Sequence, residues 1–474
     1  MNSLLSRRFC HALLLGTIAI ALDGCVLPPK VEPQLEQLSA DHLGLTGPST
    51  PRADAAWWRA YGDDQFNTLV DTTLAKNTTL AQTQARVRAA QAQSQIARGG
   101  IGPDYSFSGS ETRQRYSENY IIPPPFGGGT FWQGSVLANI SWNIDLWGRQ
   151  AALIRGADAA SYAAQLDLAG SRLATTVALS QTYLDLNRAY ALADIAQESV
   201  RQRQRIVDLV KKRIGAGLDT TVELREAEGA VPQAELSRAQ AEAARDLAVH
   251  RLAALAGEGA NIYTSLQRPT LNLETTLDVP TELPADLLGR RPDVLAARAR
   301  VEAATASRAA AKAAFYPNVN LSAFAGFQAI GLDNLLESGS RTYGAGPAIS
   351  LPLFKSSELK GEYRRATAEQ DEAIAAYNDT VLRAVQQVAD QLTLVQSSAR
   401  QLTQARSSLT AAEEAYRLAQ RRYEAGLANY LSVLTTETQV LNARTTYVDV
   451  LHAQALARVS LLLAVGGSFE PPAR

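Results

Sequence analysis

Side chains that commonly do chemistry are few in this chain, and they are scattered. There are four histidines and two cysteines: His11, His42, His250, His452, Cys10 and Cys25. The sequence contains no HExxH, CxxC or GxSxG pattern, and neither a Walker loop nor a GxGxxG turn is present. Carboxylates are plentiful, but they are spread along stretches typical of solvated helix faces. The sequence therefore gives no support for a catalytic site, a metal site or a bound cofactor.

One cysteine has a chemistry of its own. A basic pair precedes an apolar run, residues 12–22, which is too short to span a bilayer as a helix. The run leads into Gly24-Cys25 in a pattern that resembles the bacterial lipobox, although Asp23 stands where a small neutral residue is usual. We therefore predict that residues 1–24 are a lipoprotein signal peptide and that Cys25 is acylated. The alternative is ordinary cleavage nearby, which would leave Cys25 free.

The composition excludes some classes of partner and of fold. The chain has 46 basic and 47 acidic residues, a formal net charge of −1, whereas a nucleic-acid partner would require a basic face. Aromatic residues make up only 7% of the sequence, and alanine and glutamine are abundant through its middle. This composition is typical of long exposed helices rather than of one thick globular core.

The chain carries an internal duplication. Residues 86–90 align with 300–304 at an offset of 214, and residues 213–218 align with 422–427 at an offset of 209. Two constant offsets indicate that the copies differ mainly by one longer loop in the first copy, located at 117–130. Each copy is predicted to contain a helix, a strand, a loop, a strand, a very long helix, a tight turn and a further helix.

The helices must be unusually long. Residues 148–213 and 353–470 contain no proline, and a helix of about 66 residues is ~100 Å long. In the second stretch apolar residues recur about every 3.5 positions, which is the seam of a left-handed coiled coil: Ile374, Tyr377, Val381, Ala384, Val388, Leu392 and Val395. Such helices pack lengthwise on one another, and a soluble coiled-coil scaffold is one structure that fits.

Four segments of alternating polar and apolar residues argue against that scaffold. In the clearest one, Trp132, Val136, Ala138, Ile140 and Trp142 alternate with Gln133, Ser135, Asn139 and Ser141. Membrane β-strands have this two-faced pattern and a length of ~9–11 residues. Four strands cannot close a barrel, and lipid does not tolerate an open sheet edge, so the chain must oligomerise. Two chains would give a barrel filled by side chains, whereas three would leave room for a duct.

Together these features resemble the TolC-like outer membrane factors, and especially their NodT-type lipoprotein branch. The matching residues are Trp57-Trp58 with Tyr61, Asp63 and Leu69, then Arg290-Arg291-Pro292-Asp293, Phe315-Tyr316-Pro317, and the strand ends at 141–146 and 349–354. The resemblance covers residues 25–465. It implies a mixed α+β membrane protein, in which three chains with four strands each form a 12-stranded transmembrane β-barrel continued by a long α-helical coiled-coil barrel.

The same resemblance implies a function and partners. The homotrimer would lie in the outer membrane, anchored by lipid and extending into the periplasm, and would passively conduct drugs or other small molecules. A periplasmic adaptor (membrane fusion) protein and an inner-membrane transporter would complete the efflux pump. The resemblance implies no enzyme activity and no cofactor. A type I secretion outlet and a non-channel, lipid-anchored coiled-coil scaffold remain as alternatives.

Two turns, 215–219 and 425–429, join long antiparallel helices. Glycine is expected where a helix ends in a left-handed residue. By resemblance, however, these turns are also the tips that dock the adaptor, with Gly217, Leu218, Gly426 and Leu427 as contact residues. A basic run approaches the first tip and is expected to be a solvated end matched to the helix dipole: Arg201, Arg203, Arg205, Lys211, Lys212 and Arg213.

The second tip also suggests where the duct narrows. Some relatives close it with an acidic and a basic side chain, but the matching positions here are Thr435 and Thr438, so that pair is not carried over. The candidates for the pore constriction are Tyr423, Tyr430, Leu431, Thr435 and Glu437. Core packing is the alternative role for the aromatic residues among them.

These observations divide the chain into six predicted segments. They are the signal peptide (1–24), a lipid-anchored extended strap (25–65), the first structural repeat (66–256), an equatorial linker (257–283), the second structural repeat (284–465) and a C-terminal tail (466–474).

Overall fold

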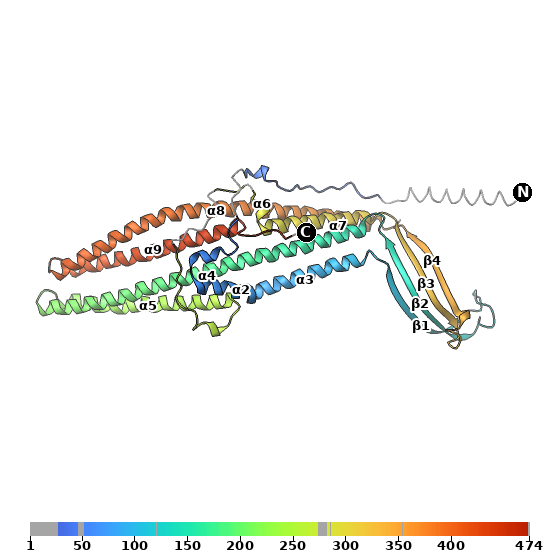
Figure 1. The fold of residues 1–474 in the computed structure, drawn as a ribbon, viewed down its shortest axis with the longest axis horizontal. Helices are drawn as coiled ribbons and strands as arrows, with labels where there is room; N and C mark the ends of the chain where they lie inside the picture. Colours follow the sequence, from blue (N-terminus) through green and yellow to red (C-terminus); the bar gives the residue numbers. More distant parts are fainter. Residues whose placement is uncertain are drawn as a thin grey trace. The chain divides into compact units, whose positions relative to one another are not determined.

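The computed structural model describes residues 27–45, 52–119, 121–273, 282–284, 286–352 and 354–472. The predicted signal peptide and the acylation site at Cys25 lie outside the described residues. The elements, labelled in Figure 1, are η1 (Asp41–Leu43), η2 (Trp57–Tyr61), α2 (Asp64–Lys76), α3 (Thr78–Gly99), β1 (Asp104–Arg115), β2 (Thr130–Ile144), α4 (Arg149–Gly215), α5 (Thr221–Leu255), η3 (Ala260–Ile262), α6 (Leu287–Arg290), α7 (Pro292–Ala313), β3 (Asn318–Ile330), η4 (Ser338–Ser340), β4 (Arg341–Ser350), α8 (Ser356–Glu424) and α9 (Tyr430–Ala464).

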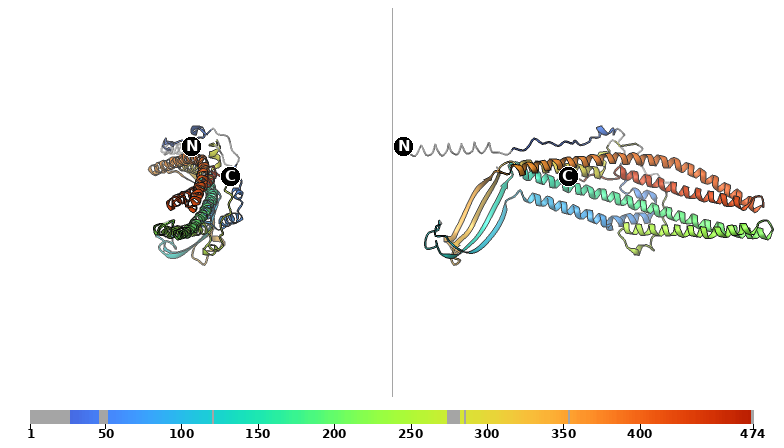
Figure 2. Two further views of the ribbon diagram at one scale, coloured as in Figure 1. Left: turned by 90° about the vertical axis from the view of Figure 1, so that its left-hand side faces the viewer. Right: turned by 180° about the vertical axis from the view of Figure 1, so that it is seen from behind.

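The chain forms two compact units, and each draws on both predicted repeats. The sheet unit takes its residues from Met1–Gln37, Arg88–Ala163 and Ala297–Tyr377, and the tip unit takes its residues from Leu38–Val87, Ala164–Ala296 and Asn378–Arg474. In the tip unit α5 runs back alongside α4, and α9 runs back alongside α8, as Figures 1 and 2 show.

The sheet unit contains one antiparallel sheet with the strand order β1-β2-β3-β4 (Figure 1). Residues directly opposite each other in such a sheet share a face. On one face polar side chains bond across the strands, with Ser110 Oγ 2.7 Å from Ser135 Oγ and Ser141 Oγ 3.2 Å from Asn320 Oδ1. The opposite face presents exposed apolar side chains, such as Phe107. The predicted alternation is confirmed.

The junction between strands and helices is held by aromatic residues. Trp147 stacks on Tyr316 with ring centroids 4.8 Å apart, and its Nε1 donates to the Pro317 carbonyl at 2.8 Å. Phe315 is buried and packs edge-on against Tyr363 of α8. The Phe-Tyr-Pro motif therefore joins the end of β2 to the start of β3 and the first turns of α8.

In the tip unit the Trp-Trp motif belongs to the main core. Trp57, Trp58, Tyr61 and Phe66 pack with apolar residues of α4, α5 and α9. Phe66 stacks on Tyr183 of α4 at 4.8 Å between ring centroids. Asp63 caps α2 by accepting from the Phe66 N–H at 2.9 Å, and its other oxygen accepts from the Tyr183 hydroxyl at 3.0 Å.

The Arg-Arg-Pro-Asp motif joins two helix ends in the same unit. Pro292 is the first residue of α7, a position where its missing N–H costs nothing. Arg291 donates to both carboxylate oxygens of Asp293, at 3.0 and 2.7 Å, and to the Ala464 carbonyl at 2.8 Å. The guanidinium thereby satisfies a carbonyl that the C-terminus of α9 leaves unpaired.

The predicted coiled-coil seam on α8 is confirmed. The seam residues from Ile374 to Val388 are buried, and Leu392 and Val395 pack against the core cluster that contains Leu461. Helix α9 is apolar and long enough to cross a membrane by length and composition. Its buried residues nevertheless pack in the core clusters of the tip unit, for example Val459 and Leu462.

Candidate functional site at the helical tips

The first tip is a compact turn that closes α4. Gly217 has φ = 71°, a left-handed conformation that favours glycine. The Leu218 N–H donates to the Arg213 carbonyl at 2.9 Å, which is the long bond of a Schellman motif. Thr220 then begins α5 with a capping box to Glu223. Leu218 is left 59% exposed at the end of the hairpin.

The second tip repeats this backbone at the offset of 209 seen in the sequence. Gly426 has φ = 76°, and the Leu427 N–H donates to the Arg422 carbonyl at 2.8 Å. Asn429 caps α9 by accepting from the Ser432 N–H at 3.1 Å. Leu427 is 71% exposed. All four residues predicted for docking therefore lie in the turns, and both leucines are exposed.

A buried ion pair fixes the first turn to the second hairpin. The Arg213 guanidinium donates to both carboxylate oxygens of Asp219, at 2.9 and 3.1 Å, and to the Tyr423 carbonyl at 2.5 Å. It also lies 4.2 Å above the Tyr423 ring, whose hydroxyl donates to Asp219 at 2.5 Å. Both members of the ion pair are less than a tenth exposed. Arg213 is therefore not part of a solvated basic end, as the sequence had suggested.

The ionisation of this cluster follows from its contacts. Burial acts to raise the pKa of Asp219, but the hydrogen bonds from Arg213 and Tyr423 outweigh it and hold that pKa below its usual value. The bond to Asp219 raises the pKa of Arg213. Burial, reinforced by Asp219, raises the pKa of the Tyr423 hydroxyl. All three groups are held in their ordinary charge states at neutral pH.

The predicted constriction residues separate into two sets. Leu431 and Thr435 are exposed on α9. Tyr423, Tyr430 and Glu437 are buried, and both tyrosines belong to a core cluster with apolar residues of α4, α5 and α9. In this conformation the buried set lies inside the packed helices of the tip unit.

Glu437 is a carboxylate in an apolar setting. It is fully buried, and neither oxygen has a hydrogen-bond partner among the described residues. The nearest cation is Arg203 of α4, whose Nε lies 3.4 Å from Oε1 and whose Nη1 donates to the Ala230 carbonyl of α5 at 2.9 Å. Burial raises the pKa of Glu437, and the attraction of Arg203 offsets only part of this.

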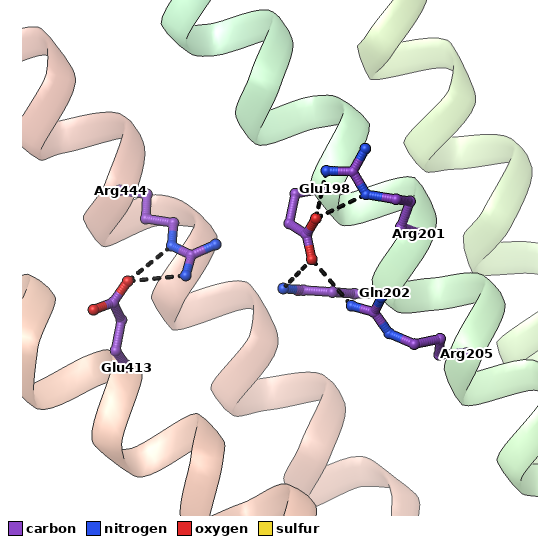
Figure 3. Close-up of polar contacts among 6 residues, drawn as sticks. All are labelled: Glu198, Arg201, Gln202, Arg205, Glu413 and Arg444. Carbon is purple, nitrogen blue, oxygen red and sulfur yellow. Dashed lines mark hydrogen bonds and ion pairs between the residues drawn. The ribbon is translucent and has the colours of Figure 1, made fainter.

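Two further ion clusters flank this region (Figure 3). On α4, Glu198 accepts from Arg201 at 2.6 and 2.8 Å and from Arg205 at 3.0 Å. Glu413 of α8 accepts from Arg444 of α9 at 3.0 and 2.9 Å. The bond from Arg201 is the main cause of the lowered pKa of Glu198. Four members of the basic run of α4 therefore pair with nearby carboxylates rather than serving only the helix dipole: Arg201, Arg203, Arg205 and Arg213.

Sequence reasoning missed the contacts of Arg213, Asp219 and Arg203. The one available signal was a difference between the copies, because Asp219 aligns with Ala428 at the offset of 209. No group of three or more His, Cys, Asp or Glu residues suited to a metal ion occurs in the part of the chain that the structure describes.

The comparison with known families decides the identity. The model of the outer membrane efflux protein family matches residues 69–258 and 283–467. The chain belongs to this family. The two matched stretches nearly coincide with the two predicted repeats, 66–256 and 284–465.

Individual relatives agree with this membership. The fusaric acid resistance protein FusA of Burkholderia cepacia is 34% identical over 367 residues, which are 75% of this chain and 69% of FusA. The outer membrane protein OprJ of Pseudomonas aeruginosa is 28% identical over 455 residues, 96% of this chain and 95% of OprJ. The crystal structure of the outer membrane protein VceC of Vibrio cholerae matches with a TM-score of 0.83 and 33% identity, covering 88% of this chain and all of VceC.

The predicted class of protein is thereby confirmed. This efflux protein has the fold of the trimeric outer-membrane channels, with a β-barrel and a helical duct, and it functions in the outer membrane as the outlet of an efflux pump. The predicted partners, two further copies of the chain, a periplasmic adaptor and an inner-membrane transporter, are confirmed with it. The family is one of channel proteins.

Proposed function

We propose that this efflux protein is a passive outlet for small organic molecules and that it catalyses no reaction. The observation that carries the proposal is the two-faced sheet, because a polar face bonded across strands suits a water-filled lumen and the apolar face suits lipid. Relatives are named for resistance to fusaric acid and for efflux of antibiotics or toluene. These names favour small molecules over a secreted protein as cargo.

The two tips are the proposed docking site for the adaptor. Each turn presents a leucine on a backbone that is already fixed by a Schellman bond, so binding orders little additional chain. Exposed leucines at the ends of helical hairpins suit contact with an apolar groove of a partner. The Arg213–Asp219 pair keeps the first turn in place beside the second hairpin.

Substitution of the tip leucines tests this proposal. Leu218→Asp and Leu427→Asp should leave trimer yield and outer-membrane insertion nearly unchanged, because both side chains are exposed in the chain. Adaptor binding, measured with purified proteins, should fall at least tenfold, because an unpaired carboxylate in an interface is costly. Drug resistance should fall with it. The matched controls Leu218→Met and Leu427→Met keep an apolar side chain and should retain both.

Two outcomes would overturn the docking proposal. Low trimer yield in the aspartate variants would show that the leucines are structural. Full resistance and unchanged adaptor affinity in the double variant would place docking elsewhere on the protein.

Leu431 and Thr435 are the proposed constriction residues, with Tyr423, Tyr430 and Glu437 as the packed layer behind them. Residues that narrow a threefold duct lie close to their own copies around the axis. Thr435→Cys should therefore cross-link the subunits with a short bis-maleimide, whereas the buried control Val433→Cys should not. Absence of cross-linking at 435 would remove that residue from the constriction.

Acylation of Cys25 remains a proposal, since that residue lies outside the described part of the chain. The strap that follows is extended and tied down in the sheet unit: the N–H groups of Gln34 and Leu35 donate to Asp371 at 2.8 and 3.1 Å. Cys25→Ser should abolish labelling by a radioactive fatty acid and slow signal-peptide removal. Unchanged labelling would disprove the lipid anchor.

A further inference from the structure

One large aromatic side chain lies among the central positions on the polar face of the sheet. Phe324 of β3 pairs with Asn139 of β2 and with Gly344 of β4. Asn139 donates to Ser108 at 3.1 Å, so Phe324 shares the face of the cross-strand polar network. Most other central positions on this face are small or polar. The exception is Leu137, which pairs with Gly326 and so lies diagonal to Phe324, within reach of an aromatic side chain.

The ring of Phe324 can pack against the sheet because its neighbour, Gly344, has no side chain. A Cβ added at Gly344 would lie 2.8 Å from Cε1 and 2.9 Å from Cζ of Phe324. The ring therefore covers the Gly344 backbone, an arrangement known to stabilise glycines in strands. Phe324 is still 41% exposed. One face of the ring thus packs on β4 while the other meets whatever fills the lumen.

We propose that Phe324, together with Leu137, is a contact site for apolar and aromatic solutes in transit through the barrel, and that Gly344 keeps the ring out of their path. The inference rests on the proposed function, because it requires the polar face to line a lumen that conducts small organic molecules. In the trimer the site occurs three times around the axis.

The chemistry of the wall supports this assignment. Serines, asparagines and glycines offer a passing apolar solute nothing to pack against, whereas an exposed phenylalanine face offers dispersion contact and release of water. Conduction also requires that each contact be weak enough to release the solute. One half-covered ring meets both conditions. A ring that projected freely toward the axis would narrow the duct.

A pair of matched cations tests the contact. Benzyltrimethylammonium and tetramethylammonium carry the same charge, but only the first has an aromatic ring. With trimers in planar bilayers and the probe added on the extracellular side, benzyltrimethylammonium should block the native channel with longer dwell times. Phe324→Ser should shorten those dwell times at least threefold and leave tetramethylammonium unchanged. Phe327→Ser, on the lipid-facing side of the same strand, should alter neither.

The role of the glycine is tested separately. Gly344→Ala should push the ring toward the axis and lower the open-channel conductance, and adding Phe324→Ser should restore it. The conservative variant Phe324→Tyr should keep the longer benzyltrimethylammonium block. Equal dwell times in the native and Phe324→Ser channels would overturn the contact site. If Phe324→Ser does not restore the conductance that Gly344→Ala lowers, the proposed role of Gly344 is wrong. Because purified trimers need no adaptor, these results are independent of the docking experiment.

Discussion

The two tips have the same backbone turn but different side-chain support. Each has a left-handed glycine and the same Schellman bond. At the first tip Arg213 is buried in a bidentate pair with Asp219. At the second, the aligned Arg422 is exposed and Ala428 replaces the aspartate.

This difference shows that the two copies share the glycine turn but not the ion pair. The turn depends on glycine, because few other residues adopt a positive φ without strain. The ion pair depends on a single carboxylate, which one copy has and the other lacks. Asp219 also accepts from Tyr423 of the second hairpin. The first tip therefore carries a polar contact to the second hairpin that has no counterpart among the described residues of the second tip.

The largest expected effect is the loss of that pair. Arg213→Ala leaves Asp219 nearly buried without its cation and with only the Tyr423 hydroxyl as a side-chain donor among the described residues. This should cost about 2–3 kcal/mol, less than the loss of a fully buried pair, because the site lies at a helix end. Hydrogen exchange of amides around the first turn should accelerate by roughly 30- to 150-fold. The aligned control, Arg422→Ala, removes an exposed side chain and should change exchange at the second turn by less than about 0.5 kcal/mol.

The comparison would be contradicted if Arg213→Ala and Arg422→Ala accelerated hydrogen exchange equally, each at its own turn. That result would mean that the backbone turns alone set local stability and that the buried pair adds nothing. Asp219→Asn offers an independent check, because it removes the charge while keeping the shape and should also loosen the first turn.

A second contrast between the copies concerns two glutamates. Glu437 is buried beside Arg203, whereas the aligned Glu228 pairs with Arg225 at 2.8 Å on the surface of α5. Because burial raises the pKa of Glu437, the folded protein holds that proton more tightly than the unfolded chain. The contribution to stability is therefore present below the unfolded value near 4.5 and is lost as pH rises through the folded pKa.

Glu437→Gln should consequently unfold at a higher temperature than the native trimer at pH 7.5, by an amount equivalent to about 1 kcal/mol. The advantage should shrink to nothing as pH falls and the native carboxyl becomes protonated. Glu228→Gln should show no such trend. A Glu437→Gln trimer that is less stable at pH 7.5 would show that the ion pair with Arg203 outweighs the cost of burial.

Sequence patterns predicted the features that depend on local spacing. The strands follow from alternation, the α8 seam from the 3.5-residue repeat, and the turns from glycine after a long helix. The exposure of Leu218 and Leu427 also followed from their place in those turns. The Arg213–Tyr423 contact did not, because 210 residues separate its partners and no local pattern encodes it.

The polar face of the sheet shows the same limit. Alternation assigns faces along one strand, but the position of Phe324 over Gly344 depends on the register between β3 and β4. Likewise, Glu437 sits on a helix with no obvious polar or apolar stripe, so its burial follows from packing against α4. The sequence predicted the helices and strands themselves but not the contacts between them.

The smallest expected effect comes from giving the second tip the missing carboxylate. Ala428→Asp places an acid where Asp219 stands in the first copy, six residues after the exposed Arg422. Because Arg422 is solvated, the new pair should contribute only about 0–1 kcal/mol, and salt should screen it. Hydrogen exchange at the second turn should slow by less than about fivefold at low salt and return to the native rate at high salt. A large, salt-independent slowing would mean that Arg422 moves into a buried site like that of Arg213. The two tips would then differ in one residue rather than in their surroundings, and the first tip's hold on the second hairpin would follow from Asp219 alone.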